Sequence, residues 1–189
     1  MKKQSLKYED YERASKQLNC EIEAIMAVAE VESSGSGFLV DGRPKILYER
    51  HIFHRLTLGK WSASHPHISN SKAGGYGKSG VHQHNRLEEA AKLDRASALQ
   101  ACSWGKFQIL GENWRDLKYK SLQEFINCMY RSEAEHLDSF VRFIKRNNLD
   151  RYLRDKDWKS FARRYNGPAY ARNQYDIKMA NAYNRLKCV

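Results

Sequence analysis

The stretch that decides the fold of this chain is AVAEVESSGSGF, residues 27–38. It closes an apolar run, places Glu30 and Glu32 at the end of that run, and then breaks into serine and glycine. On a helical wheel one side of the run carries Ile22, Ile25, Met26 and Ala29, and the other carries Ala24, Ala27, Val28 and Val31. A helix that is apolar nearly all round is a buried central helix. Gly35 and Gly37 follow it, and glycine is typical of the residues that end helices.

The rest of the chain is mostly helical in its pattern. Apolar residues recur at helical spacing in segments 6–18, from Glu21 onward, 87–101, 121–132, 133–147, 157–165 and 170–186. Ser121 followed by Glu124 fits a capping box that opens one of these helices. Strand-like alternation is scarce, and DGRPKILYER, residues 41–50, reads as a turn followed by a short extended piece near 44–50. The sequence therefore predicts a mainly α fold with one small β element.

A long non-periodic segment separates two of the predicted helices. From about residue 59 to 86 the chain reads GKWSASHPHISNSKAGGYGKSGVHQHNR, rich in glycine, serine, asparagine and histidine. A loop of this length inside a small domain is more often functional than a linker. Neither flank reads as an independent domain, so we expect residues 1–189 to form a single domain with a loop-rich insertion.

The composition is that of a folded protein. Of the 189 residues 41% are hydrophobic and 12% are aromatic. The chain has no run of about 18 apolar residues, so we expect no transmembrane segment. The basic N-terminus MKKQSLKYEDYERASKQLN lacks the apolar core of a signal peptide.

The cysteines and histidines give little sign of a bound metal. The four cysteines, none in a Cys-x-x-Cys pair, are Cys20, Cys102, Cys128 and Cys188. In a chain without an export signal this scatter favours free thiols over a disulfide framework. Histidines pair at His65 and His67 and at His82 and His84, without cysteine or carboxylate ligands at the usual spacings. We therefore expect no metal and no other cofactor.

The charge balance is strongly basic. Lys and Arg number 33 against 22 Asp and Glu, a formal net charge of +11. Such a charge favours polyanionic surroundings, whether nucleic acid, anionic lipid or a bacterial envelope. The basic residues are spread along the chain rather than bunched, which weakens the case for a dedicated nucleic-acid site.

The position of the two glutamates at the end of the apolar run is one that suits an acid catalyst. Burial and the partial negative charge of a helix C-terminus both disfavour an ionised carboxylate, so both raise the pKa of a carboxyl group placed there. A carboxyl group that stays protonated near neutral pH can act as a general acid. The alternative is that Glu30 and Glu32 flank the core as solvated charges. The helical wheel does not separate the pair, since they lie on opposite flanks of the Ile22 face.

A second segment, SWGKFQILG at residues 103–111, places a glycine and a glutamine among aromatic side chains. Gly105 permits close approach of the backbone. Gln108 offers amide donors and an acceptor beside two aromatic residues, a combination that suits the apolar faces and polar edges of a sugar. The alternative is a core turn with buried aromatics.

A third segment, ARRYNGPAY at residues 162–170, runs from a predicted helix end into Asn166, Gly167 and Pro168. Read locally, it is a helix stop. Tyr165 and Asn166 also offer a phenol and an amide to any cleft that they border.

In this order the three segments resemble the lysozyme-like superfamily. In goose-type lysozymes and soluble lytic transglycosylases a Glu-Ser pair ends a buried helix, a Gly-x-x-Gln segment follows, and a Tyr-Asn element lies towards the C-terminus. Here these elements are Glu32-Ser33, Gly105 to Gln108, and Tyr165-Asn166. The chain is more closely similar to the phage-type N-acetylmuramidase family, often the catalytic domain of endolysins, over roughly residues 8–187. The similarity is carried by AVAEVESSGSGFLVDGRPKILYERHIFHRLT and ASALQACSWGKFQILGENW.

The resemblance implies an α+β lysozyme-like fold, in which a helical domain with a buried catalytic helix and a small β and loop-rich lobe flank a substrate cleft. It implies a glycoside hydrolase that cuts the β-1,4 bond between N-acetylmuramic acid and N-acetylglucosamine in peptidoglycan and so lyses bacteria. Glu32, rather than Glu30, is then the general acid. The residues expected to bind the substrate are Ser103, Phe107, Gln108, Tyr165 and Asn166.

The resemblance also implies partners and a setting. We expect a monomer that acts on bacterial peptidoglycan, is held to the anionic envelope by its positive charge, and binds no specific nucleic acid. An endolysin stays in the cytoplasm of the host bacterium until a holin releases it, and then acts in the periplasm and cell wall. The alternatives are a lytic transglycosylase that forms anhydro-muramic ends, a muramidase effector injected into rival bacteria, and, in a different class, a basic nucleic-acid-binding protein.

Most glycosidases use a second carboxylate, and Glu49 is the candidate here. It could face Glu32 across the cleft and activate water or stabilise positive charge on the sugar, or it could pair with Arg43 or Arg50 and fix the loop. Asp41 is a weaker candidate because Asp-Gly-Arg-Pro reads as a turn. Tyr76, in the GGYG motif at 74–77, either caps the cleft as a platform for a sugar or belongs to a loop that only bridges two helices.

Overall fold

The computed structural model describes residues 3–32 and 35–188 and shows a mainly helical fold with a small sheet. The α-helices are α1 (Tyr8–Leu18), α2 (Ile22–Glu32), α3 (Arg50–Leu56), α4 (Val81–Gln100), α5 (Leu122–Arg131), α6 (Glu133–Arg146), α7 (Asp150–Asp155), α8 (Trp158–Tyr165) and α9 (Tyr175–Lys187). The strands are β1 (Ile46–Tyr48), β2 (Cys102–Trp104) and β3 (Ile109–Leu110), and the 3₁₀ helices are η1 (Gly111–Trp114) and η2 (Pro168–Tyr170). The predicted fold class is confirmed.

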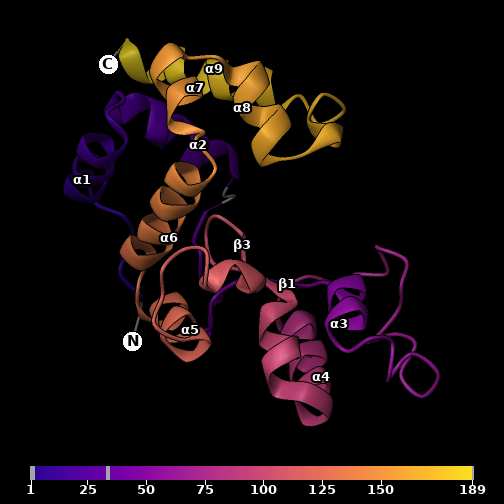
Figure 1. Ribbon diagram of the computed structural model, residues 1–189. Helices are drawn as coiled ribbons and strands as arrows, with labels where there is room; N and C mark the ends of the chain where they lie inside the picture. Colours follow the sequence, from indigo (N-terminus) through magenta and orange to yellow (C-terminus); the bar gives the residue numbers. More distant parts are fainter. Residues whose placement is uncertain (1–2, 33–34, 189) are drawn as a thin grey trace.

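Helix α2 is the buried central helix that the sequence predicts. It packs against α1, α7 and α9, and Figure 1 shows α7, α8 and α9 gathered around its end of the molecule. Its fully buried residues come from both sides of the helical wheel: Ala24, Ile25, Ala27, Val28 and Ala29. Burial of both sides explains why polar residues are confined to the two ends of the helix. The helix ends at Glu32, as predicted, and Gly35 has a positive φ of 81°.

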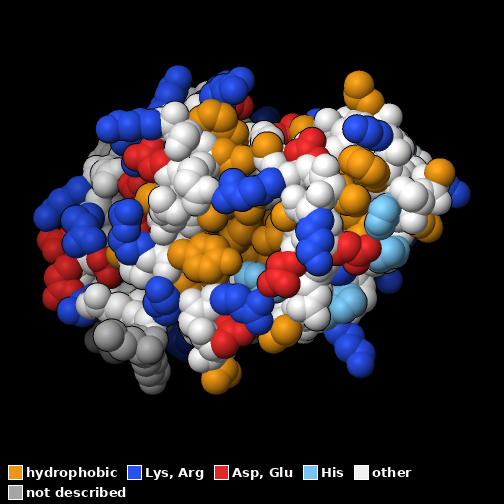
Figure 2. Space-filling view, turned by 90° about the horizontal axis from the view of Figure 1, so that it is seen from below, with side chains coloured by type: hydrophobic (Ala, Val, Ile, Leu, Met, Phe, Trp, Pro, Cys, Tyr) orange, Lys and Arg blue, Asp and Glu red, His pale blue; other side chains and the backbone are white. Residues whose placement is uncertain are grey.

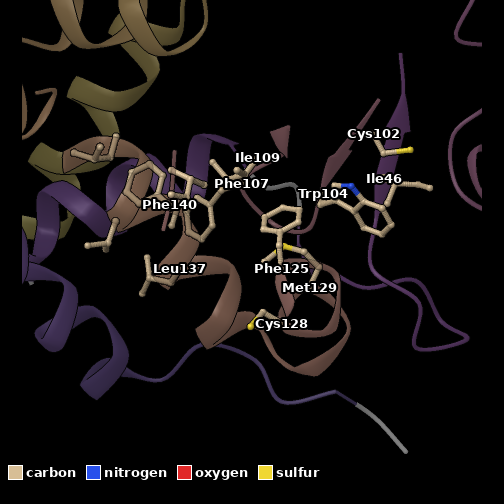
Figure 3. Packing of buried hydrophobic residues seen from close by; sticks show 14 of the residues in the cluster. Ile46, Cys102, Trp104, Phe107, Ile109, Phe125, Cys128, Met129, Leu137 and Phe140 are labelled. Atoms are coloured by element: carbon tan, nitrogen blue, oxygen red, sulfur yellow. The ribbon is translucent and has the colours of Figure 1, made fainter. Parts of the chain in front are cut away.

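The sheet lies between the α5–α6 part of the molecule and the α3–α4 part (Figure 1). Its order is β1-β2-β3, antiparallel throughout, with Ile46 opposite Trp104 and Trp104 opposite Ile109. Figure 3 shows how the sheet joins the helical core, with the rings of Phe107 and Phe140 side by side. These rings stack with centroids 4.7 Å apart. The loop after β2 is thereby fixed to α6.

Helices α3, α4 and α7 differ from the predictions. Helix α3 begins at Arg50, at the end of the piece expected to be extended, and its seven residues are too few to show helical periodicity. Helix α7 is six residues long and was missed for the same reason. Helix α4 begins at Val81, inside the predicted loop 59–86. It is interrupted at Asp94, whose non-helical backbone places its carboxylate 2.9 Å from the amide of Ser97.

Two smaller predictions concern a helix cap and the cysteines. Ser121 caps α5 by accepting a hydrogen bond from the Glu124 amide at 3.1 Å. The Glu124 carboxylate accepts from the amide of Lys120 rather than from that of Ser121, so only half of the predicted capping box forms. The four cysteines are free thiols, as the sequence favours.

Among the described residues no cluster of three or more His, Cys, Asp or Glu side chains could hold a metal ion. None of the described helices combines the length and the apolar character needed to cross a membrane. Figure 2 shows Lys and Arg side chains scattered over one face with acidic side chains among them, so the positive charge of that face is dispersed.

Candidate active site

Glu32, the last residue of α2, borders two neighbouring hollows in the surface. The first has a volume of about 410 Å³ and is lined by the segment after α2, by β1, by the residues just before α4 and by the loop after β2. The second, of about 280 Å³, is lined by β3, η1, α6 and the end of α8. Glu32 and Gln108 line both hollows. The site is therefore built from segments that are far apart in the chain.

The Glu32 carboxyl group is largely buried, and burial raises its pKa. The side-chain amide of Asn166 donates a hydrogen bond to Glu32 Oε1 at 2.7 Å, and this bond lowers the pKa by favouring the charged form. Burial is the larger effect, so the pKa of Glu32 stays above its ordinary value. The structure thus brings together Glu32 and Asn166, two residues that the sequence singled out 134 positions apart.

Gln108 is exposed between the two hollows and adopts a left-handed backbone conformation with φ of 49°. Such a conformation is uncommon for a residue other than glycine. The Gln108 amide donates to the carbonyl of Gly105 at 2.9 Å, which fixes the side chain across its own turn. The left-handed conformation is therefore supported by a local hydrogen bond.

The turn that carries Gln108 rests on His136 of α6. A Cβ atom on Gly105 would lie 2.8 Å from the His136 ring, so this position admits only glycine. The amide of Lys106 donates to His136 Nδ1 at 3.1 Å, and His136 Nε2 contacts the carbonyl of Met129 at 2.8 Å. The close approach that the sequence predicts for Gly105 is an approach to a buried imidazole.

Tyr165 and Phe107 stabilise the site through internal contacts with each other and with neighbouring residues. The Tyr165 hydroxyl donates to the Phe107 carbonyl at 2.9 Å. The Phe107 side chain is only 2% exposed and stacks on Phe140. Both residues border the second hollow, but Phe107 offers a substrate almost no surface. The role of Phe107 in substrate binding stays a prediction, carried by its place at the border of the second hollow.

Ser103 lies in the middle of β2, paired with Leu47 on one side and Leu110 on the other. Leu47 lines the first hollow and Leu110 the second, whereas Ser103 is absent from the lining of both. The structure therefore does not bring Ser103 to the site with Glu32. Ser33, the second residue of the predicted Glu-Ser pair, lies outside the described residues.

Glu30 and Glu32 differ in surroundings despite their closeness in sequence. The Glu30 side chain is 52% exposed and forms an ion pair with Arg185 of α9. It borders a different hollow, with Tyr11, Met26 and Leu186, on the far side of the helix end. Glu30 is thus a solvated surface charge, whereas Glu32 is enclosed. Of the two glutamates, only Glu32 borders the hollows that Gln108 also lines.

Glu49 follows β1 and precedes α3, and its side chain is 16% exposed. It lines neither hollow, although Ile46 and Leu47 of the preceding strand line the first. Arg43 pairs with Asp41 and Glu88, and Arg50 donates to the carbonyl of Lys72, so neither arginine pairs with Glu49 as the structural alternative proposed. Asp41 accepts hydrogen bonds from Arg43 within the predicted turn.

The neighbours of the Glu49 carboxyl group come from several elements. Burial raises its pKa, while the Tyr76 side chain and the charges of His51 and Arg86 lower it. Glu49 Oε2 lies 3.4 Å from His51 Nδ1, and neither atom has a hydrogen-bond partner. Burial is the largest effect, so the pKa of Glu49, like that of Glu32, is raised even though several neighbours favour its charged form.

Comparison with known proteins decides the family. A sequence model of the family described as "Muramidase: N-acetylmuramidase" matches residues 21–187. The chain is a member of the N-acetylmuramidase family. A solved structure, that of the Burkholderia AP3 phage endolysin, is 45% identical with a TM-score of 0.91, over 96% of this muramidase and 70% of the other chain. No curated protein matches this muramidase.

Membership makes the protein a glycoside hydrolase, and the resemblance stated from the sequence is confirmed. The muramidase site also contains residues that the sequence reading missed. Lys106 Nζ donates to the carbonyl of Gly35 at 2.7 Å and lies 3.5 Å from the buried carboxylate of Glu133. Glu133 also accepts from the amide of Gly37 at 2.6 Å. This buried pair ties the segment after Glu32 to the Gln108 turn, and no local sequence signal links Glu133 of α6 to either.

Proposed function

We propose that this muramidase cleaves the β-1,4 bond between N-acetylmuramic acid and N-acetylglucosamine in bacterial peptidoglycan, with Glu32 as the general acid. The observation that carries the proposal is the position of Glu32 at the border of two hollows, with a pKa raised by burial. A glycan chain that crosses from one hollow to the other passes Glu32. A carboxyl group held protonated there can donate its proton to the glycosidic oxygen.

Asn166 and Gln108 assist this chemistry in different ways. Asn166 fixes the carboxyl group through its 2.7 Å hydrogen bond and stabilises the carboxylate that remains after proton transfer. Gln108 presents an exposed amide at the border of both hollows, where it can bind hydroxyl or N-acetyl groups of the sugars on either side of the bond.

Glu49 is the candidate second carboxylate. Three groups lower its pKa (Tyr76, His51 and Arg86), whereas Asn166 is the one group that lowers the pKa of Glu32. We propose that Glu49 activates water or stabilises positive charge on the sugar, since it follows directly after β1, whose Ile46 and Leu47 line the first hollow.

The biological setting that follows from the proposal is that of an endolysin. The related AP3 protein is a phage endolysin. We propose that this chain likewise remains in the host cytoplasm until a holin releases it, acts as a monomer in the periplasm and cell wall, and is retained by the anionic envelope through its net charge of +11.

The deciding experiment replaces Glu32 by Gln, which keeps the shape of the side chain but removes the acid. We expect wall lysis to fall at least a thousand-fold, a size on the order of the general-acid contribution. The matched control is Glu30→Gln, two residues away and paired with Arg185, which should lyse walls at the wild-type rate. Melting curves establish that both variants fold. Full activity of a folded Glu32→Gln protein overturns the assignment.

Product analysis tests the type of reaction. Purified peptidoglycan is digested with wild-type protein and the released muropeptides are weighed by mass spectrometry. Hydrolysis leaves reducing ends that carry one added water, and this is the result we expect. Anhydro-muramic ends, lighter by one water, would identify a lytic transglycosylase instead.

A further inference from the structure

The carboxylate of Glu133 contacts three segments that are far apart in the chain. Glu133 is the first residue of α6 and is 2% exposed. Its Oε1 accepts a hydrogen bond from the Gly37 amide at 2.6 Å, and its Oε2 accepts from the Leu6 amide at 3.2 Å and lies 3.5 Å from Lys106 Nζ. A carboxylate buried in this way needs hydrogen bonds and a cation, and Glu133 has both. It therefore joins the segment before α1, the segment after α2 and the turn after β2.

Lys106, on that turn, also contacts the segment after α2 directly. Its Nζ donates to the Gly35 carbonyl at 2.7 Å. A Cβ atom on Gly37 would lie 2.7 Å from His136 Nδ1 and 2.9 Å from Lys106 Cβ, so the segment packs closely against both the turn and α6. Polar contacts and close packing together fix the separation between the segment and the turn.

The two segments that Glu133 and Lys106 join form part of the first hollow. The segment after α2 contributes Ser36 to its lining, and the turn contributes Gln108. Glu32, which lines it as well, precedes Gly35 by only three positions. Glu133 itself lines neither hollow. Any effect of Glu133 on the reaction therefore passes through the segments that it holds.

We propose that Glu133 is a positioning residue, and that its buried ion pair with Lys106 sets the separation between Glu32 and Gln108 across the first hollow. The inference rests on the proposed role of Glu32 as the general acid. The glycosidic oxygen must come within hydrogen-bond reach of Glu32 while Gln108 binds the sugar beside it. The separation of these two side chains decides how well the bond is placed for proton transfer.

The test measures kcat and KM of Glu133→Gln on soluble glycan strands, at a temperature well below its unfolding transition. Glutamine keeps an oxygen that can accept from the Gly37 amide, but it lacks the charge that attracts Lys106. We expect kcat to fall at least tenfold while KM changes less than about twofold, because a displacement of about 1 Å can cost up to a hundred-fold in rate. The matched control is Glu135→Gln on the same helix, whose carboxylate pairs with Arg131 at the surface and whose loss should leave both constants unchanged.

A role of Glu133 in stability alone gives a different result. It would lower the melting temperature and leave the kcat of the folded protein at the wild-type value. That outcome overturns the inference.

Lys106→Met tests the other member of the pair and separates positioning from substrate contact, since Lys106 also lines the first hollow. We expect the same fall in kcat, and the double variant with Glu133→Gln should lose no more than either single variant, because both changes break one interaction. A raised KM at unchanged kcat would show that Lys106 binds substrate, and multiplied losses in the double variant would show that the two residues act separately. Either result overturns the inference. The control is Lys156→Met, which breaks an ion pair with Glu21 that borders neither hollow and should leave kcat unchanged.

The double variant also covers a Glu133→Gln protein that folds poorly. Removal of one member of a buried pair leaves the other charge unpaired, whereas removal of both leaves no buried charge, so the double variant is expected to fold better. Wild-type kcat in the folded double variant, or in folded Lys106→Met, overturns the inference. Failure of the proposed function is read separately: an active Glu32→Gln protein refutes the role of Glu32, whereas an inactive Glu32→Gln beside fully active Glu133 and Lys106 variants refutes the positioning role alone.

Discussion

The end of α2 and the end of β1 each present one enclosed glutamate, and the neighbours of the two carboxyl groups differ. Burial raises the pKa of both Glu32 and Glu49. At the end of α2 the side chain of Asn166 alone offsets burial, whereas at the end of β1 Tyr76, His51 and Arg86 do so together. The two carboxyl groups thus share a raised pKa and differ in how many neighbours oppose the effect of burial.

Of the changes that test this comparison, Glu49→Gln should reduce activity the most. It removes the charged partner and leaves Glu32 in place, so we expect kcat on purified peptidoglycan to fall about a hundred-fold. Glu88→Gln, an exposed glutamate on α4, is the matched control and should leave kcat unchanged. Wild-type activity of a folded Glu49→Gln protein would mean that the site works with Glu32 alone.

Asn166→Ala tests the surroundings of the other glutamate, Glu32 at the end of α2. The Asn166 amide favours the ionised form of Glu32, so its removal raises the pKa of Glu32 further. Glu32 then stays protonated to higher pH, and the alkaline limb of the kcat profile moves upward.

We also expect kcat at neutral pH to fall about tenfold, because the acid loses the hydrogen bond that fixes it. The control is Asn127→Ala, an exposed asparagine of α5. A downward shift of the alkaline limb would contradict the assignment of Glu32 as the proton donor.

Gln83→Ala tests whether the stability of the protein depends on the buried connection between the end of β1 and the segment that contains Tyr76 and Lys78. The change leaves the Tyr48 amide and the carbonyls of Tyr76 and Lys78 without their partner. We expect the free energy of unfolding to fall by about 3 kcal/mol, measured by urea denaturation. Gln123→Ala, at an exposed position of α5, should cost well under about 1 kcal/mol. Equal stability of the two variants would refute the anchoring role of Gln83.

Salt should have the smallest effect, and it acts on neither carboxyl group directly. If the net charge of +11 holds the protein to the envelope, lysis of intact walls should fall several-fold as salt rises above about 0.1 M, where charges more than about 10 Å apart are screened. Cleavage of short soluble glycan fragments, measured in parallel, should change little. An equal loss on both substrates would locate the effect in the site rather than in the retention of the protein on the wall.

Two kinds of signal guided the sequence analysis, namely the local pattern of residues and the order of motifs along the chain. Helix α2 was recognisable because apolar residues cover its whole wheel, and its end because Gly35 follows. Asn166 and Gln108 were found because resemblance to a family places them in order with Glu32, and the structure brings both to Glu32. The burial of the Phe107 ring could not be foreseen, because an aromatic residue beside a glycine looks the same in sequence whether its ring faces a cleft or, as here, a core.

What the sequence by itself determined is the mainly helical fold, the buried helix that ends at Glu32, the family and the difference between a candidate acid and its neighbour Glu30. These follow from periodicity and from motif order, which are properties of the chain. Tertiary structure alone decided that His136 and Glu133 hold the Gln108 turn. Those contacts join residues about 27 to 96 positions apart, and a pKa depends on what surrounds a group in space, which no local pattern of residues records.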